Sequence, residues 1–262
     1  MKPENLNSFN TLSNLVAKDS NLIVQSTRMD FETNTYVSEL WKMSKGNWRK
    51  FKSGNIMETV GFTKMEDGTA EEYAFLTPLY NNCLNSVPDT LLKILKQMQG
   101  EKLGYKIDRY THSLQSATRA ERDGANEETI VCTLMHDIGD ILSPQNHSQV
   151  AASLLRPYIS EQNYWILKHH GLFQGYYYFH HLNKDRNVRE KYINHPYYQS
   201  CVDFCHKWDQ SSFDPDYDTF PLEHFEPMVK NVLGKPLKTF EEALRVAQHA
   251  ETRGCAITEG ER

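Results

Sequence analysis

Apolar residues recur every three to four positions over most of the chain, and this spacing is typical of amphipathic helices. The pattern becomes regular at Thr69 and Glu72, which have the three-residue spacing of a helix-capping box. A second helix is predicted to begin at Pro88-Asp89 and to end at Gly100. Alternation with a period of two is almost absent. The fold is therefore predicted to be all-α.

Further helices are predicted along the rest of the chain, bounded by glycine, proline or capping residues. They are expected at about residues 112–124, 127–137, 148–157, 161–170 and 197–209, with two shorter ones at 223–233 and 239–252. These helices are enough to form one bundle, and no internal repeat or second helical domain is visible.

The N-terminal segment has a different character. It is rich in Asn, Ser and Thr and then in basic residues, and its apolar periodicity is patchy. We therefore expect residues 1–56 to form an extension, partly disordered, and residues 57–262 to form the helical domain with its C-terminal helices.

Composition and charge narrow the functional class. The net charge of −5 and the absence of arginine-rich motifs argue against nucleic-acid binding. No apolar run is long enough to span a bilayer, and the first residues lack the apolar core of a signal peptide. The five cysteines are odd in number and scattered, as is typical of free thiols. We expect a cytoplasmic protein that acts on a small molecule without nucleic-acid or membrane partners; the oligomeric state stays open.

The candidate chemistry centres on a His-Asp pair at the end of an apolar helical run. An isolated pair of this kind is more often a buried salt bridge, but this one has companions. The candidate ligands are His112, His136, Asp137, His147, His170 and Asp209. Four imidazoles and two carboxylates suit iron, manganese, zinc or nickel better than magnesium or calcium. They are also more than one tetrahedral zinc needs, so they fit two metal ions with Asp137 as the bridge.

The order His, His-Asp, His, His, Asp along helices resembles the HD-domain superfamily over roughly residues 66–233. A single-metal version of this fold needs only one His, the His-Asp pair and a final Asp. The two additional histidines make this chain resemble the dinuclear version. The segment HSLQSA that begins at His112 is similar to the first ligand helix of the HD-domain mixed-valent di-iron oxygenases. That group includes myo-inositol oxygenase and the oxygenases that cleave hydroxylated phosphonates, and the segment up to Ala125 is especially similar to the latter.

This resemblance implies an O2-dependent non-haem di-iron oxygenase that oxidises or cleaves a small hydroxylated substrate. An Fe(II)/Fe(III) pair would be the cofactor and O2 the co-substrate. The resemblance also assigns the six candidate ligands to the two ions, with Asp137 between them. It favours His170 over its neighbour His169 as the fourth histidine, and Asp209 over Asp203 as the last ligand.

Further residues are predicted to take part in catalysis or substrate binding. Asp137, Asp140 and Gln115 are the catalytic candidates; Gln115 lies one helical turn after the first histidine, so its amide could reach the site. The substrate-binding candidates are Tyr105, Asp140, Gln174, Tyr176 and His206. Tyr105 and Tyr110 are the alternatives for the tyrosine that covers the iron in related oxygenases.

The same positions argue against a phosphonate substrate. Where the phosphonate enzymes have basic residues after the fourth histidine and before the last aspartate, this chain has Gln174 and His206. Asp140 occupies the position of their histidine. With the aromatic residues nearby, Asp140 would suit a substrate that bears an amino or ammonium group.

Two other functions compete with the oxygenase. One is a metal-dependent phosphohydrolase of the HD type, acting on a nucleotide or a small phosphate ester. No obvious set of Lys and Arg residues surrounds the ligands, which counts against it. The other is a non-catalytic module with a decayed site, and the presence of all six ligands counts against that.

Overall fold

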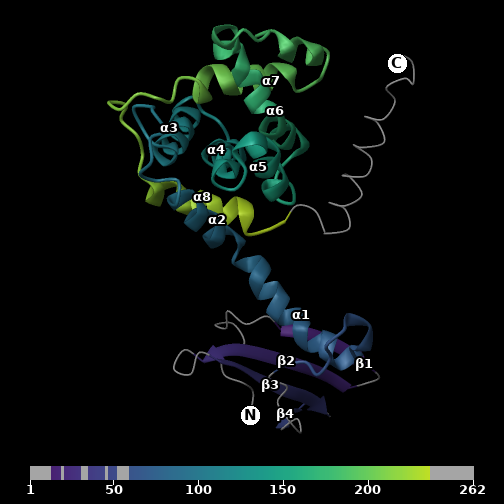
Figure 1. Ribbon diagram of the computed structural model, residues 1–262. Helices are drawn as coiled ribbons and strands as arrows, with labels where there is room; N and C mark the ends of the chain where they lie inside the picture. The colour runs from purple at the N-terminus through teal and green to yellow at the C-terminus, as the bar shows by residue number, and fades with distance from the viewer. Residues whose placement is uncertain (1–12, 19–20, 31–34, 45–46, 52–58, 237–262) are drawn as a thin grey trace, which may run out of the picture. The chain divides into compact units, whose positions relative to one another are not determined.

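The computed structural model describes residues 13–18, 21–30, 35–44, 47–51 and 59–236 (Figure 1). For the first four of these segments only the backbone is described. The chain divides into two compact units, Met1–Asn85 and Ser86–Arg262. None of the helices in the described part has the length and apolar character that crossing a membrane requires.

The first unit contains an antiparallel sheet with the strand order β1-β2-β3-β4. The strands are β1 (Ser13–Lys18), β2 (Asn21–Asp30), β3 (Thr35–Ser44) and β4 (Asn47–Phe51). Each strand pairs with the next one along the chain, and Val24 of β2 lies opposite Trp41 of β3. The sheet falls within the segment for which the sequence analysis expected an extension and no strands.

These strands were not predicted because their apolar residues do not alternate. In β3, Tyr36 and Val37 are neighbours, and so are Leu40 and Trp41. Adjacent apolar residues break the period of two that identifies a half-buried strand. Backbone hydrogen bonds between consecutive strands form the sheet, and such bonds leave no strong pattern in the sequence. The domain boundary near residue 56 stays a prediction.

The unit ends with α1 (Ala70–Asn85), which begins where the capping box was predicted. The Thr69 backbone N–H donates to Glu72 Oε2 at 2.9 Å, and the Glu72 backbone N–H donates to Thr69 Oγ1 at 3.3 Å. The two residues thus satisfy each other's free N–H groups at the helix start. The predicted capping box is confirmed.

In the second unit every described element is helical, as predicted. The α-helices are α2 (Val87–Lys96), α3 (Arg109–Arg122), α4 (Glu127–Met135), α5 (His147–Leu155), α6 (Glu161–Tyr178), α7 (Tyr198–Phe204) and α8 (Leu222–Leu233). Short 3₁₀ turns occur at Ile138–Ile141, Pro144–Asn146, Phe179–Leu182 and Val188–Tyr192, and a π-turn at Cys205–Asp209 follows α7. The helix expected at 239–252 lies outside the described residues.

Side-chain caps place the ligand-bearing helices. Asp108 accepts a hydrogen bond from the Thr111 backbone N–H at 2.7 Å and so starts α3, and Asn126 starts α4 in the same way. Ser160 caps α6, which runs two turns further than predicted and takes up the aromatic-rich segment. These caps determine where each helix begins, and therefore which residues face the interior.

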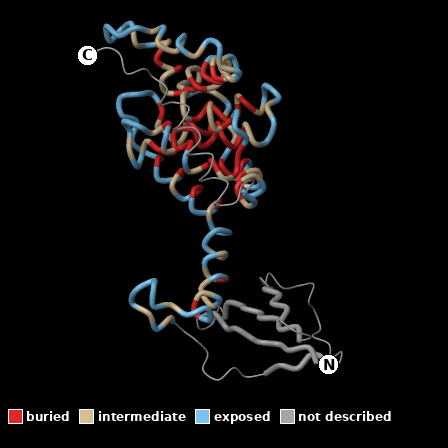
Figure 2. Tube along the Cα trace, turned by 90° about the vertical axis from the view of Figure 1, so that its right-hand side faces the viewer, coloured by how far each residue is buried: buried red, intermediate tan, exposed pale blue. Residues whose placement is uncertain are grey.

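The core of the second unit surrounds α4, and six of the nine residues of this helix are buried. Leu134, Met135 and Ile138 are fully buried next to the His-Asp pair. Figure 2 shows the buried residues gathered inside the bundle. A second apolar cluster around Phe173 and Phe204 joins α6 to α7. Because apolar packing surrounds it, the His-Asp pair is held in a largely dry interior.

Candidate metal centre

The structure brings all six predicted ligands into one cluster. His112 comes from α3, the His-Asp pair from the end of α4, His147 from the start of α5, His170 from the middle of α6, and Asp209 from the π-turn after α7. Their ligand atoms form overlapping groups of three within 4.8 Å of one another. A buried His/Asp cluster of this kind can hold a metal ion.

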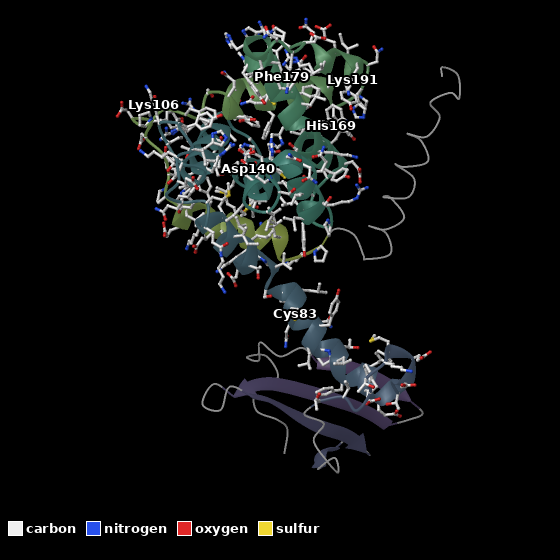
Figure 3. The ribbon with its side chains drawn as sticks, in the orientation of Figure 1. Cys83, Lys106, Asp140, His169, Phe179 and Lys191 are labelled. Atoms are coloured by element: carbon white, nitrogen blue, oxygen red, sulfur yellow. The ribbon has the colours of Figure 1, made fainter. Side chains whose placement is uncertain are left out.

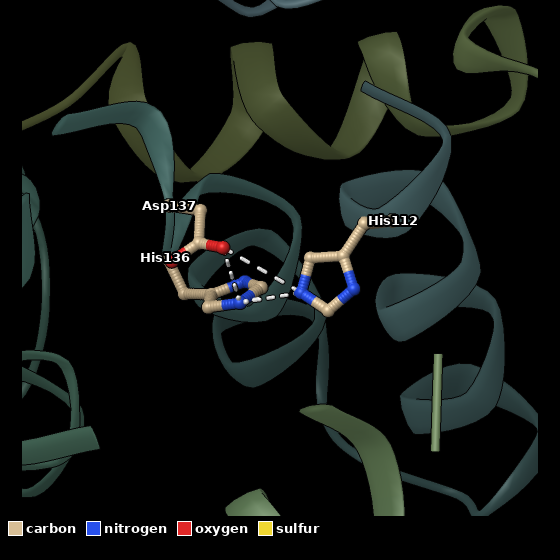
Figure 4. A group of neighbouring side chains, drawn as sticks. All are labelled: His112, His136 and Asp137. Carbon is tan, nitrogen blue, oxygen red and sulfur yellow. Dashed lines mark hydrogen bonds and ion pairs between the residues drawn. The ribbon is translucent and has the colours of Figure 1, made fainter. Parts of the chain in front are cut away.

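Asp137 lies between two sets of histidines. Its Oδ2 is 3.6 Å from His112 Nε2 and 3.5 Å from His136 Nε2, as drawn in Figure 4. Its Oδ1 is 3.4 Å from His147 Nε2 and 3.3 Å from His170 Nε2. Each carboxylate oxygen therefore faces a different pair of imidazoles, which is the arrangement of a bridging ligand.

Asp209 pairs with the histidines on one side of this division, although its ligand atom also lies within 4.8 Å of that of His170. Its Oδ1 is 3.4 Å from His112 Nε2 and 3.7 Å from His136 Nε2. We name His112, His136 and Asp209 the closed half of the cluster, and His147 with His170 the open half. Asp137 is shared by both halves.

Each histidine is oriented by a hydrogen bond from its outer ring nitrogen. The Nδ1 atoms donate to four backbone carbonyls, at Ser212 (2.8 Å), Thr133 (2.7 Å), Pro144 (3.0 Å) and Leu167 (2.7 Å). This bonding directs every Nε2 into the cluster, as in most protein metal sites. Within each half the two Nε2 atoms are only 3.1 Å and 3.3 Å apart. At most one Nε2 atom of each pair can carry a proton, so in each half a nitrogen lone pair points into the space between the two rings.

The electrostatics favour a positive charge in the cluster. Burial opposes a charged imidazole at His136, but the Asp137 and Asp209 carboxylates outweigh it and raise its pKa to about 9. Burial also disfavours ionised carboxylates, yet the surrounding histidines lower the pKa of Asp137 and of Asp209. The same field that holds a proton would hold a metal ion, so the donor set fits a divalent or trivalent cation.

Two glycines allow the ligand-bearing segments to approach one another. A Cβ on Gly139 would lie 2.3 Å from the carbonyl oxygen of His147. A Cβ on Gly171 would lie 2.6 Å from Ser148 Oγ and 3.4 Å from His147 Nε2. Any larger residue would push the start of α5 away from the cluster, which explains the glycine after the His-Asp pair.

Asp140, labelled in Figure 3, supports the cluster from beside His147. Its Oδ1 is 3.2 Å from His147 Nδ1, and its Oδ2 is 2.9 Å from Arg109 Nη2. Burial and the nearby Asp137 charge raise the Asp140 pKa, while Arg109 and His147 partly offset them. Asp140 thus lies beside the cluster, and Arg109 and His147 compensate only part of the cost of its charge.

Arg109 was not among the residues predicted from the sequence. In the described part of the chain, it is the basic side chain that pairs with the carboxylate of the ligand Asp137. Its Nη1 is 3.0 Å from Asp137 Oδ2, so its guanidinium spans Asp137 and Asp140. The available signal was position: Arg109 precedes His112 by three residues and therefore lies on the same face of α3.

The two predicted glutamines have different surroundings. Gln115 is fully buried, and both polar atoms of its amide bind the Asp214 backbone, at 2.7 Å and 3.1 Å. Gln174 Nε2 donates to Asp209 Oδ1 at 3.0 Å. The Gln174 Oε1 atom is buried, and no described group donates a hydrogen bond to it. Gln174 therefore borders the cluster with a free acceptor, whereas in the described part of the chain no hydrogen bond joins the Gln115 side chain to a ligand.

Two of the predicted substrate residues lie at the surface. Tyr105 is about half exposed and stacks on Phe213 at 5.2 Å between ring centroids, and Phe213 stacks on the His112 ring at 4.5 Å. Tyr105 is thus separated from the first ligand by one ring. His206 is exposed, and its Nδ1 lies 3.3 Å from the Tyr177 hydroxyl.

The surroundings of Tyr176 and Asp140 argue against the expected ammonium group. The guanidinium carbons of Arg186 and Arg189 lie 4.1 Å and 3.7 Å from the Tyr176 ring centroid. Asp140 is already paired with Arg109. A second cation at Tyr176 or Asp140 would have to compete with these arginines, and the ammonium receptor stays a prediction.

His169 points away from the cluster that its neighbour His170 enters. Its ring stacks on Trp165 at 4.2 Å, and its Nδ1 binds the Trp165 carbonyl oxygen at 2.8 Å. Burial lowers its pKa to about 4, which keeps the ring neutral. The structure thus places His170, and not His169, among the candidate ligands.

Comparison with known proteins agrees with this architecture. A family model of the HD domain matches residues 109–199, so the second unit contains an HD domain. The match includes five of the six clustered ligands and ends before Asp209. No curated protein matches the chain. The matched region is an HD domain whose buried His and Asp residues could hold a metal ion.

Proposed function

We propose that this protein is an O2-dependent oxygenase that holds two iron ions and oxidises or cleaves a small hydroxylated substrate. The observation that carries the proposal is the division of the cluster by Asp137, whose two oxygens face separate pairs of imidazoles. A single metal ion would leave one half of the cluster unused. Nitrogen-rich ligands with carboxylates are a donor set that suits iron.

The protein side of this chemistry is orientation and charge. Bound iron would supply the redox chemistry with O2. Asp137 joins the two halves, and Arg109 holds Asp137 Oδ2 and Asp140 Oδ2 in place. Asp140 Oδ1 also lies 3.2 Å from His147 Nδ1, which donates to the Pro144 carbonyl. These contacts keep the ligand geometry rigid, which is what a two-metal site requires of its surroundings.

Gln174 favours an alcohol as the substrate group. Its Nε2 donates to Asp209, so its Oε1 must be an acceptor, because the flipped amide would set two oxygens against each other. An alcohol can donate its O–H to this buried oxygen, whose desolvation otherwise costs about 1–3 kcal/mol. A phosphate dianion has no proton to donate and would be repelled. The free acceptor therefore supports a hydroxylated substrate.

The experiment is metal analysis and low-temperature EPR on protein expressed with added iron and treated with a mild reductant. We expect about two irons per chain and the S = 1/2 signal of a coupled Fe(II)/Fe(III) pair. O2 uptake should then follow when small hydroxylated compounds are added, and Gln174→Leu should raise KM for the alcohol. One ion per chain, or two ions without O2 uptake by any compound tested, would count against the oxygenase.

Arg109 supports a second candidate, the metal-dependent phosphohydrolase. Its guanidinium lies beside Asp137, where two metal ions could clamp a phosphate, and Arg suits bidentate phosphate binding. Release of phosphate from nucleotides or small esters by zinc- or manganese-loaded protein would favour this function. Under the oxygenase proposal we expect no metal-dependent phosphate release above that of Asp137→Asn protein.

A further inference from the structure

The segment that follows Asp209 lies along α3, the helix that carries the first ligand. We name residues 210–220 the strap. At its start the Ser212 backbone N–H donates to the Asp209 carbonyl at 3.0 Å, and the Ser212 carbonyl accepts from His112 Nδ1 at 2.8 Å. The strap therefore connects two ligands of the closed half, which are nearly a hundred residues apart in the chain.

Two further contacts hold this part of the strap against α3. The Phe213 ring stacks on the His112 ring at 4.5 Å with an interplanar angle of 28°. Gln115, one turn further along α3, donates from Nε2 to the Asp214 carbonyl at 2.7 Å and accepts the Asp214 backbone N–H at 3.1 Å. Because both polar atoms of this buried amide are used, Gln115 clamps the strap backbone at two points.

The rest of the strap binds the following turns of the same helix. The Phe220 backbone N–H donates to Thr118 Oγ1 at 3.1 Å. The Tyr217 ring lies 3.8 Å from the Arg119 guanidinium carbon, and Asp218 pairs with Arg122 at 2.7 Å. These contacts are remote from the ligands, so they provide controls for the Gln115 contact.

The histidines of the open half depend on other segments. The His147 and His170 rings are oriented by the Pro144 and Leu167 carbonyls, each three residues earlier in the chain. In the described part of the molecule, no hydrogen bond, ion pair or ring contact links the strap to either ring. A change in the strap should therefore leave the open half as it is.

We infer that Gln115 is a positioning residue that sets the metal affinity of the closed half through the strap. It places Ser212 and Phe213 so that the His112 ring is held both at Nδ1 and over its face, and so that Asp209 is anchored beside it. The inference rests on the proposed two-metal site.

Cobalt(II) titration of the metal-free full-length protein tests this inference. Affinity is followed by chelator competition, and the visible absorption of cobalt reports its ligand set. Gln115→Leu keeps the side-chain volume and removes both hydrogen bonds. We expect it to weaken one of two cobalt sites by about 10- to 100-fold, the usual effect of losing a residue that orients a metal ligand. Phe213→Leu, which perturbs the same path from the strap side, should weaken the same site.

Two backgrounds identify the affected half. With His147→Ala, which leaves the closed half intact, Gln115→Leu should weaken the remaining site and change its absorption spectrum. With His112→Ala, the same substitution should have no further effect. Thr118→Val, which removes the strap contact at Phe220, is the matched control and should bind cobalt like wild type.

The outcomes separate this inference from the proposed function. If wild type binds two cobalt ions and Gln115→Leu binds both with unchanged affinity, the inference is overturned while the two-metal site stands. If wild type binds one ion, the two-metal proposal fails, and unchanged affinity in Gln115→Leu would overturn the inference as well. Equal weakening in both histidine backgrounds would show a general structural role and would also overturn it. Circular dichroism and thermal unfolding verify that each variant is folded.

Discussion

The two halves of the cluster differ in how they are closed and in what holds them. In the closed half, the side chains of His112, His136 and Asp209 are at most 5% exposed. In the open half, the His147 side chain is 23% exposed, although His170 is buried. Solvent therefore reaches the cluster at His147. Metal exchange and the approach of small molecules are expected on that side.

The hydrogen bonds to the histidines show a second difference. His136, His147 and His170 each donate to a carbonyl three residues earlier, at Thr133, Pro144 and Leu167. His112 donates to Ser212, one hundred residues later. Three ligands are thus oriented by local backbone, and one by a distant segment. In the open half, local backbone orients both histidine rings, whereas in the closed half His112 is oriented only when the strap has docked.

The largest expected effect comes from Asp137, because both halves share it. Asp137→Asn keeps the size of the side chain and removes its charge. We expect cobalt affinity to fall by more than about 100-fold at both sites, beyond the usual effect of residues that only orient a ligand. O2-dependent activity should fall to background. Retention of one tight ion by this variant, measured by metal analysis, would show that Asp137 is not a bridge.

Gly139→Ala should weaken cobalt binding at the open half, whereas Gln115→Leu should weaken it at the closed half. The new methyl group would lie 2.3 Å from the His147 carbonyl oxygen, so the start of α5 must move. We expect the open half to lose about 10- to 100-fold in cobalt affinity and the protein to lose about 1–3 kcal/mol of stability. Cobalt titration and urea unfolding measure both effects. Ile141→Ala, in the same turn and partly exposed, is the control and should keep both sites.

Acid should destabilise the metal-free protein in part through His169. Its pKa is about 4 in the folded state, below the usual 6.5, so the unfolded chain binds the extra proton between these values. The contribution of His169 is therefore complete above pH 6.5 and is lost as the pH falls toward 4. Allowing for its partial exposure, we expect this loss to be about 1–2 kcal/mol.

His169→Phe keeps a ring on Trp165 and removes the titration. Its free energy of unfolding should therefore fall less than that of wild type between pH 6.5 and pH 4, as measured by urea unfolding. Identical pH profiles for the two proteins would contradict the buried, neutral state of His169.

The smallest effect is expected at the far end of the strap. Asp218 is almost fully exposed, and its ion pair with Arg122 is therefore weak. Asp218→Asn should change stability by less than about 0.5 kcal/mol and leave both cobalt sites unchanged. A loss of metal at the closed half in this variant would mean that the strap acts as one rigid piece, and not through its first residues.

The sequence by itself determined the helices of the second unit and the identity of the six clustered residues. Helical periodicity and capping residues are local properties, so Asp108 and Ser160 could start helices whatever the rest of the chain did. The order His, His-Asp, His, His, Asp carried the resemblance to HD domains, and the family match at residues 109–199 agrees with it. The strands of the first unit were missed because their apolar residues lack a local period.

Only the tertiary structure decided how these residues are used. The division of the cluster by the two oxygens of Asp137, the ion pairs of Arg109 and the clamp of Gln115 on Asp214 all join separate segments. Their side-chain types are compatible with many roles, and the role depends on which backbone atoms lie within hydrogen-bonding distance. For the Gln115 clamp, that distance is set by the packing of α3 against the strap, over nearly one hundred residues of intervening chain. A local sequence pattern carries no information on such a contact.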